Sequence, residues 1–136
     1  MSKYKDLTEI KNFEDLKQNV YFKRTVLSDI QIAKLCPGND LGRIQEIMQS
    51  KDVTKQIDFL IKLMLILNEQ YMKYCNVWDK EAERGVDLSE AILTTLTIEQ
   101  ISELSEVAFA DFIGDGDAEV EVVAKKKEKE VVDLKK

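Results

Sequence analysis

The chain has 136 residues, enough for one domain of ordinary size with a single hydrophobic core. Hydrophobic residues make up 44% and charged residues 34%, a composition typical of soluble globular proteins and not of disordered chains. The net charge of −6 weighs against nucleic-acid binding, and the absence of histidine weighs against most zinc-dependent and histidine-dependent catalysis.

Helix-breaking residues are rare, and they divide the chain into long segments that suit helices. Proline occurs once, at Pro37, and the glycines are Gly38, Gly42, Gly85, Gly114 and Gly116. Three capping-box spacings, each expected to mark a helix start, are Ser28 with Gln31, Asp87 with Glu90, and Thr97 with Gln100.

The first predicted elements are short. Residues 1–19 carry apolar side chains every third residue, which fits a weak amphipathic helix or an arm that docks on another surface. Residues 20–26 are aromatic and β-branched, as in a short strand. A helix is expected from Ser28 to Leu35, ending at the Cys36-Pro37-Gly38 turn, and another over residues 40–49.

The longest predicted helix runs from about Thr54 to Glu83. Its broad apolar face, expected to lie in the core, carries Leu60, Met64, Leu67, Tyr71, Tyr74, Cys75 and Trp78. The opposite charged stripe contains Asp58, Lys62, Glu69, Lys73 and Asn76, with acid-before-base pairs four residues apart. Further apolar residues lie on its two shoulders, so this helix must be covered from several sides.

Two more helices are predicted, over residues 88–96 and 97–113. In the second, Ile98, Ile101, Ala108 and Phe112 are expected to face inward. After Gly114 the chain consists almost entirely of Val, Ala, Glu and Lys, which indicates a charged low-complexity tail. Alternating acids begin at Asp115, but an EF-hand loop would place glycine and glutamate where Val120 and Lys126 stand.

No residue pattern predicts catalysis, a bound metal or a cofactor. Cys36 and Cys75 are interpreted as reduced structural residues. Tyr71, Tyr74 and Trp78 favour core packing over a ligand pocket. The longest apolar stretch, residues 59–67, contains Lys62 and is shorter than the roughly 20 residues that cross a bilayer, so no membrane span is expected.

The sequence therefore predicts a mainly α protein: a small single-domain helical bundle with a long central helix. Its expected parts are an N-terminal arm (1–19), a helical domain (20–114) and a polar C-terminal tail (115–136).

Four segments, in this order, resemble the tail assembly chaperones of long-tailed, siphovirus-like phages and prophages. The resemblance covers roughly residues 20–114. The segments are Phe22-Lys23-Arg24-Thr25-Val26 leading into Ser28-Asp29-Ile30, Cys36-Pro37-Gly38-Asn39-Asp40-Leu41, Ile57-Asp58-Phe59-Leu60, and Leu96-Thr97-Ile98-Glu99-Gln100-Ile101.

This resemblance implies a non-enzymatic protein of the host cytoplasm that binds the apolar tape-measure protein, helps recruit tail-tube protein, and is absent from the mature virion. Self-association is left open. The residues expected to contact a partner lie off the core-facing stripe: Phe59, Ile61, Leu65, Ile66 and Met72. The alternative is a small helical adaptor or regulatory protein that binds one host protein through the same apolar face.

Overall fold

The computed structural model describes residues 5–113, with side chains described for residues 5–110. This part of the chain is mainly helical and contains no strand, which confirms the predicted fold class. Its 3-10 helices are η1 (Leu7–Glu9), η2 (Pro37–Asn39) and η3 (Leu41–Arg43). Its α-helices are α1 (Phe13–Gln18), α2 (Val26–Ala33), α3 (Ile44–Met48), α4 (Val53–Trp78), α5 (Glu90–Leu93) and α6 (Ile98–Ile113).

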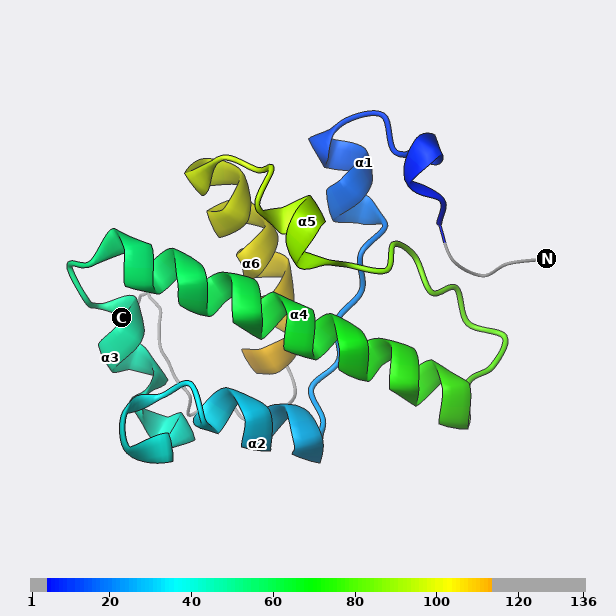
Figure 1. The fold of residues 1–136 in the computed structure, drawn as a ribbon. Coiled ribbons are helices and arrows are strands. Elements are labelled where there is room, and N and C mark those ends of the chain that lie inside the picture. Colours follow the sequence, from blue (N-terminus) through cyan, green and yellow to red (C-terminus); the bar gives the residue numbers. More distant parts are fainter. Residues whose placement is uncertain (1–4, 114–136) are drawn as a thin grey trace, which may run out of the picture.

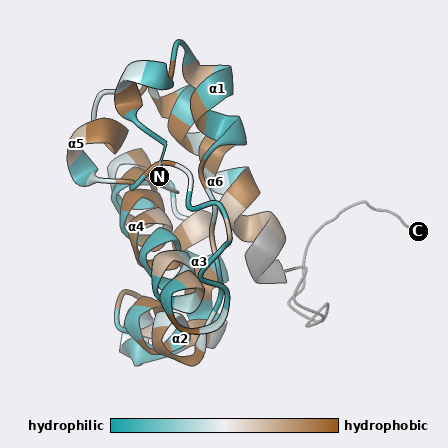
Figure 2. Cartoon of the chain, turned by 90° about the vertical axis from the view of Figure 1, so that its right-hand side faces the viewer, coloured by the Kyte–Doolittle hydropathy of each residue, from teal (hydrophilic) through white to brown (hydrophobic). Residues whose placement is uncertain are grey.

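The long helix α4 is the centre of the fold, and α2, α3, α5 and α6 all contact it (Figure 1). Helix α6 crosses α4, and α1 packs against α6. Viewed from the side, α1 and α5 lie above α4 whereas α2 lies below it (Figure 2). The predicted long central helix is therefore confirmed, with neighbours on several of its sides.

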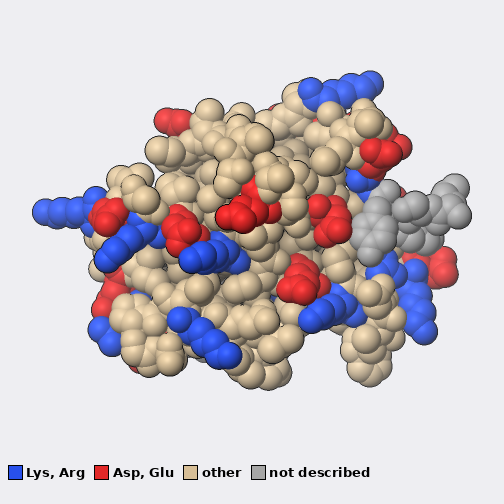
Figure 3. Space-filling model, viewed as in Figure 1, with Lys and Arg blue, Asp and Glu red and all other residues tan. Residues whose placement is uncertain are grey.

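The solvent side of α4 carries the predicted ion pairs. Asp58 and Lys62 approach to 2.9 Å, and Glu69 and Lys73 to 3.9 Å. Acidic and basic side chains are interspersed over the face that α4 crosses (Figure 3). These exposed pairs keep one side of the helix solvated, but each adds only about 0.3–0.5 kcal/mol to stability.

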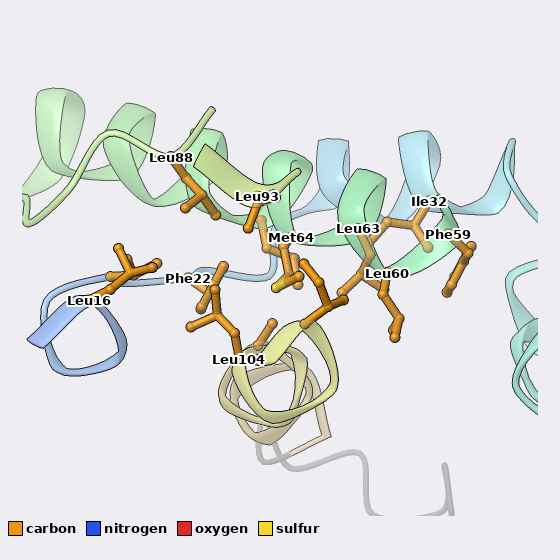
Figure 4. Close-up of a cluster of buried hydrophobic side chains, with 14 of the residues drawn as sticks. Leu16, Phe22, Ile32, Phe59, Leu60, Leu63, Met64, Leu88, Leu93 and Leu104 are labelled. Carbon is orange, nitrogen blue, oxygen red and sulfur yellow. The ribbon is translucent and has the colours of Figure 1, made fainter. Parts of the chain in front are cut away.

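The core forms where α4 meets α6 and the segments around them. Leu60, Leu63 and Met64 of α4 point toward Leu104 of α6 (Figure 4), and each is at least 96% buried. Leu16 of α1 belongs to the same cluster, so the segment predicted as an arm contributes to the core. Full burial of such an aliphatic side chain contributes about 1.5–3 kcal/mol to stability.

Two helix starts show how local sequence fixes the boundaries. At α6, Gln100 N donates to Thr97 Oγ1 and Thr97 N donates to Gln100 Oε1, both at 3.1 Å, so the predicted capping box is confirmed. At α2 the predicted N-cap was wrong: the N-cap is Thr25 and not Ser28, and Ser28 is the capping-box partner of Thr25 inside the helix. Ser28 can fill this role because its hydroxyl accepts the Thr25 N–H as a glutamate would.

The segment before α2 is extended but is not a strand. Phe22 is buried, and Lys23 N donates to the Leu67 carbonyl of α4 at 3.1 Å. The prediction of a short strand over residues 20–26 was therefore wrong, because the backbone partner of this segment is a helix and not another strand.

The long helix ends at Trp78, earlier than predicted, because Asp79 leaves the helical conformation. The chain then returns along α4, where Tyr71 Oη donates to the Glu83 carbonyl at 2.6 Å. Arg84 is buried in this return and donates to the Met72 carbonyl at 3.4 Å and to Asn76 Oδ1. The predicted tail, residues 115–136, and the side chain of Phe112 lie outside the described residues.

Candidate protein-binding surfaces

The structure separates the five residues predicted to contact a partner. Phe59 and Met72 are 4% and 7% exposed, so placing them on an open shoulder was wrong. Phe59 faces Leu35, Cys36 and Ile47, which come from the end of α2, the following turn and α3. Met72 borders a hollow together with Asp87 and Leu88 of the returning segment. Helical periodicity does not predict which segments lie over these two side chains.

The other three predicted contact residues, Ile61, Leu65 and Ile66, are half-buried and pack against the core. Leu65 borders a hollow of about 470 Å³ together with Asn68, Glu69 and Leu88. These side chains offer only part of their surface to a partner. Replacing Ile61 and Leu65 by polar residues is therefore expected to lower stability as well as any binding.

Among the described residues, the three most exposed large apolar side chains lie at the start of α2 and at the end of α4. Trp78 and Val26 are 77% and 78% exposed, and Val77 is 63% exposed. We call this set the α2–α4 surface, which consists of Val26, Leu27, Ile30, Tyr74, Val77 and Trp78. The prediction that Tyr74 and Trp78 lie in the core was wrong, because α4 extends past the elements that would cover its final turns (Figure 1).

Polar contacts hold the two parts of the α2–α4 surface together. Thr25 Oγ1 donates to Gln70 Oε1 at 2.8 Å, which fixes the start of α2 against α4. The Lys23 ammonium nitrogen lies 4.7 Å from the centre of the Tyr74 ring, a cation–π contact. The exposed apolar side chains of α2 and α4 are therefore carried on adjacent, rigid helices.

A second apolar surface is a groove between the N-terminal segment and the α5–α6 region, with a volume of about 590 Å³. Its apolar lining consists of Leu7, Ile10, Phe13, Leu16, Ala91, Ile92 and Leu96. Its polar lining consists of Lys11, Asn12, Ser89, Thr95 and Gln100. Ile98, at the start of α6, is 55% exposed, so the prediction that it faces inward was wrong. Sequence periodicity gave no sign of this groove, since its two walls are about 80 residues apart in the chain.

A third hollow, of about 500 Å³, lies beside Cys36 and is lined by charged as well as apolar residues, including Glu46, Lys55 and Asp58. Burial, with a smaller contribution from nearby Asp40, raises the pKa of the Cys36 thiol. A neutral, buried thiol is a poor nucleophile and a poor metal ligand. Among the described residues, no three Cys, Asp or Glu side chains are grouped so that they could hold a metal ion.

The comparisons with known proteins add no relative. No family model matches the chain, and searches of curated proteins and of solved structures gave no significant match. Within residues 5–113, no helix combines the length and apolar content that a membrane span requires.

Proposed function

We propose that this chain is a phage tail assembly chaperone that binds the tape-measure protein in the host cytoplasm, helps recruit tail-tube subunits and catalyses no reaction. The resemblance of residues 20–114 to that family motivates the proposal. The α2–α4 surface supports it physically, because it exposes apolar side chains on a small acidic domain.

The observation that carries the proposal is the exposure of Trp78 beside Val77. Side chains of this size are normally covered in a monomeric protein, and a contiguous exposed patch marks an interaction site. Tryptophan is also enriched among the residues that dominate binding energy, because it buries a large area with little loss of conformational freedom. Burial of Trp78 by a partner would contribute about 2 kcal/mol.

A surface of this kind suits transient masking of an apolar helical protein. The partner's apolar side chains would be covered by Val26, Val77 and Trp78, and the net charge of −6 would keep the complex soluble. Several weak contacts along a long partner would add up to firm binding, yet each could be displaced as tail-tube subunits arrive.

The test is a pull-down with an N-terminal tag on the chain, expressed from its native gene beside its native neighbours, with intact masses recorded for every captured protein. A very long, helix-rich, apolar companion is the expected result. Capture of a single small host protein at fixed stoichiometry would contradict it and favour the adaptor.

The same pull-down should be repeated with Trp78→Ser and with the control Val53→Ser. Val53 is also exposed and apolar, at 51%, but it lies at the opposite end of α4. We expect Trp78→Ser to reduce capture of the companion strongly and Val53→Ser to leave it unchanged. Equal capture by both variants would remove the α2–α4 surface from the proposal.

A further inference from the structure

The groove between the N-terminal segment and the α5–α6 region is distinct from the α2–α4 surface in every residue. Its first wall comes from η1 and α1, and its second from α5, α6 and the turns around them. Leu7 is 51% exposed at its edge, whereas Leu16 at its floor is 95% buried. The apolar lining thus extends from an exposed edge to a buried floor, and a side chain of a partner can enter the groove.

The chain segment that forms the second wall carries charge of one sign. From residue 85 to 113 the sequence contains no lysine or arginine, and its acidic residues are Asp87, Glu90, Glu99, Glu103, Glu106 and Asp111. Glu90 and Glu99 are exposed and adjoin the groove residues Ser89, Ala91 and Gln100 in the chain. The α5–α6 side therefore carries exposed acids next to the residues of its apolar lining.

The first wall carries charge of both signs: the lysines Lys5, Lys11 and Lys17 stand among the acids Asp6, Glu9, Glu14 and Asp15. Lys5 lies 3.6 Å from Glu9, and Lys17 lies 3.1 Å from Glu14 and also pairs with Glu103 of α6. Lys11 itself lines the groove. On the α5–α6 side, Glu90 and Glu99 have no lysine or arginine on their own wall.

We infer that this groove binds a segment of a partner protein that is an amphipathic helix, with an apolar stripe bordered on one side by lysine or arginine. The apolar stripe enters between Leu7 and Ile92, and the basic side chains face Glu90 and Glu99. Helix-in-groove binding of this kind takes its affinity from the apolar anchors, and complementary charge sets orientation and accelerates association. The inference does not depend on the assignment as a tail chaperone.

The test uses a synthetic amphipathic helix of leucine and lysine, fluorescently labelled, with the full-length chain as titrant. Anisotropy should give saturable binding that weakens as salt is raised, because exposed charges are screened. The same helix with glutamate in place of lysine should bind at least about tenfold more weakly, since like charges then face each other.

Variants locate the binding. Leu7→Gln and Ala91→Arg change exposed groove residues, so neither should prevent folding, and each should weaken binding of the lysine helix about tenfold. The matched control for Leu7→Gln is Val53→Gln, because both residues are 51% exposed but Val53 lies outside the groove. The double variant Glu90→Gln, Glu99→Gln should flatten the salt dependence, whereas Glu69→Gln on α4 should not.

Three results would overturn the inference. The first is equal binding of the lysine and glutamate helices, and the second is full binding by both Leu7→Gln and Ala91→Arg. The third is a clear gain in affinity when Lys125, Lys126 and Lys127 are replaced by glutamine in the full chain. That gain would assign the groove to this chain's own basic segment instead of to a partner.

Discussion

Asn68, in the middle of α4, donates from Nδ2 to the backbone carbonyl of Tyr21 at 2.9 Å. Its Oδ1 accepts the backbone N–H of Leu88 at 3.0 Å, and the side chain is 99% buried. One amide thus ties the segment before α2 and the segment after α4 to the central helix. Among the described residues neither segment belongs to a strand, so Asn68 satisfies backbone groups that burial would otherwise leave unpaired.

Replacing Asn68 by leucine should destabilise the protein by about 2–4 kcal/mol. Leucine has a similar volume, but it leaves the Tyr21 carbonyl and the Leu88 N–H buried without partners. Urea unfolding followed by circular dichroism measures the change. Gln45→Leu, at an exposed position of α3, is the control and should change stability by less than about 0.5 kcal/mol. A small effect at Asn68 would mean that water replaces the amide.

The three glycines within residues 5–113 should respond to alanine in a fixed order. Gly85 has φ +69°, and a Cβ there would overlap the Asn19 carbonyl and the Tyr21 ring, so Gly85→Ala should cost about 2–4 kcal/mol. Gly38 has φ +65° but meets only the flexible end of Arg43, so Gly38→Ala should cost about 1 kcal/mol.

Gly42 provides the control for this series, because its φ is not positive and its nearest neighbour is the Asp40 carboxylate at 3.2 Å. Gly42→Ala should change the unfolding free energy by less than about 1 kcal/mol. Thermal and urea unfolding of the three variants test the order. A larger loss at Gly38 than at Gly85 would contradict the close packing of residues 19–21 on the returning segment.

Polar substitutions should distinguish the half-buried shoulder from the exposed end of α4. Ile61→Asn and Leu65→Asn should each lower stability by about 1–3 kcal/mol, because both side chains pack against the core. Val77→Asn and Trp78→Asn should each change it by less than about 0.5 kcal/mol. Melting temperatures of the four variants provide the measurement, and a large drop for Trp78→Asn would place that side chain in a contact within the chain.

Stability should fall in alkaline solution through Tyr71. Burial, together with a hydrogen bond to Cys75, raises the pKa of the Tyr71 phenol above its ordinary value of 10.0. Above pH 10 the unfolded chain therefore releases a proton that the folded chain retains, so the free energy of unfolding decreases as pH rises. At lower pH both states are protonated and this effect is absent.

Tyr71→Phe tests this pH dependence. The variant should be less stable at neutral pH, because it loses the hydrogen bond to the Glu83 carbonyl, but its stability should fall less steeply above pH 10 than that of the natural chain. Tyr74→Phe, on the same helix at 37% exposure, is the control and should keep the natural slope. If the stability of both variants falls as steeply above pH 10 as that of the natural chain, Tyr71 is not shielded from solvent.

The sequence by itself determined the features that depend on near neighbours in the chain. The helical class, the ion pairs on α4, the Thr97–Gln100 capping box and the inward face around Leu60 and Met64 all follow from spacings of three or four residues. These interactions form within one helix, so no knowledge of the rest of the fold is needed to predict them.

Only the tertiary structure decided which apolar residues are covered. Periodicity gives the direction of a side chain around a helix axis, but not whether another element lies over that turn. Phe59 and Met72 are therefore buried although they lie off the inward face of α4, whereas Trp78 and Ile98 remain exposed at helix ends that nothing covers among the described residues. Both candidate binding surfaces arise in this way, from the lengths and paths of elements that are distant in the sequence.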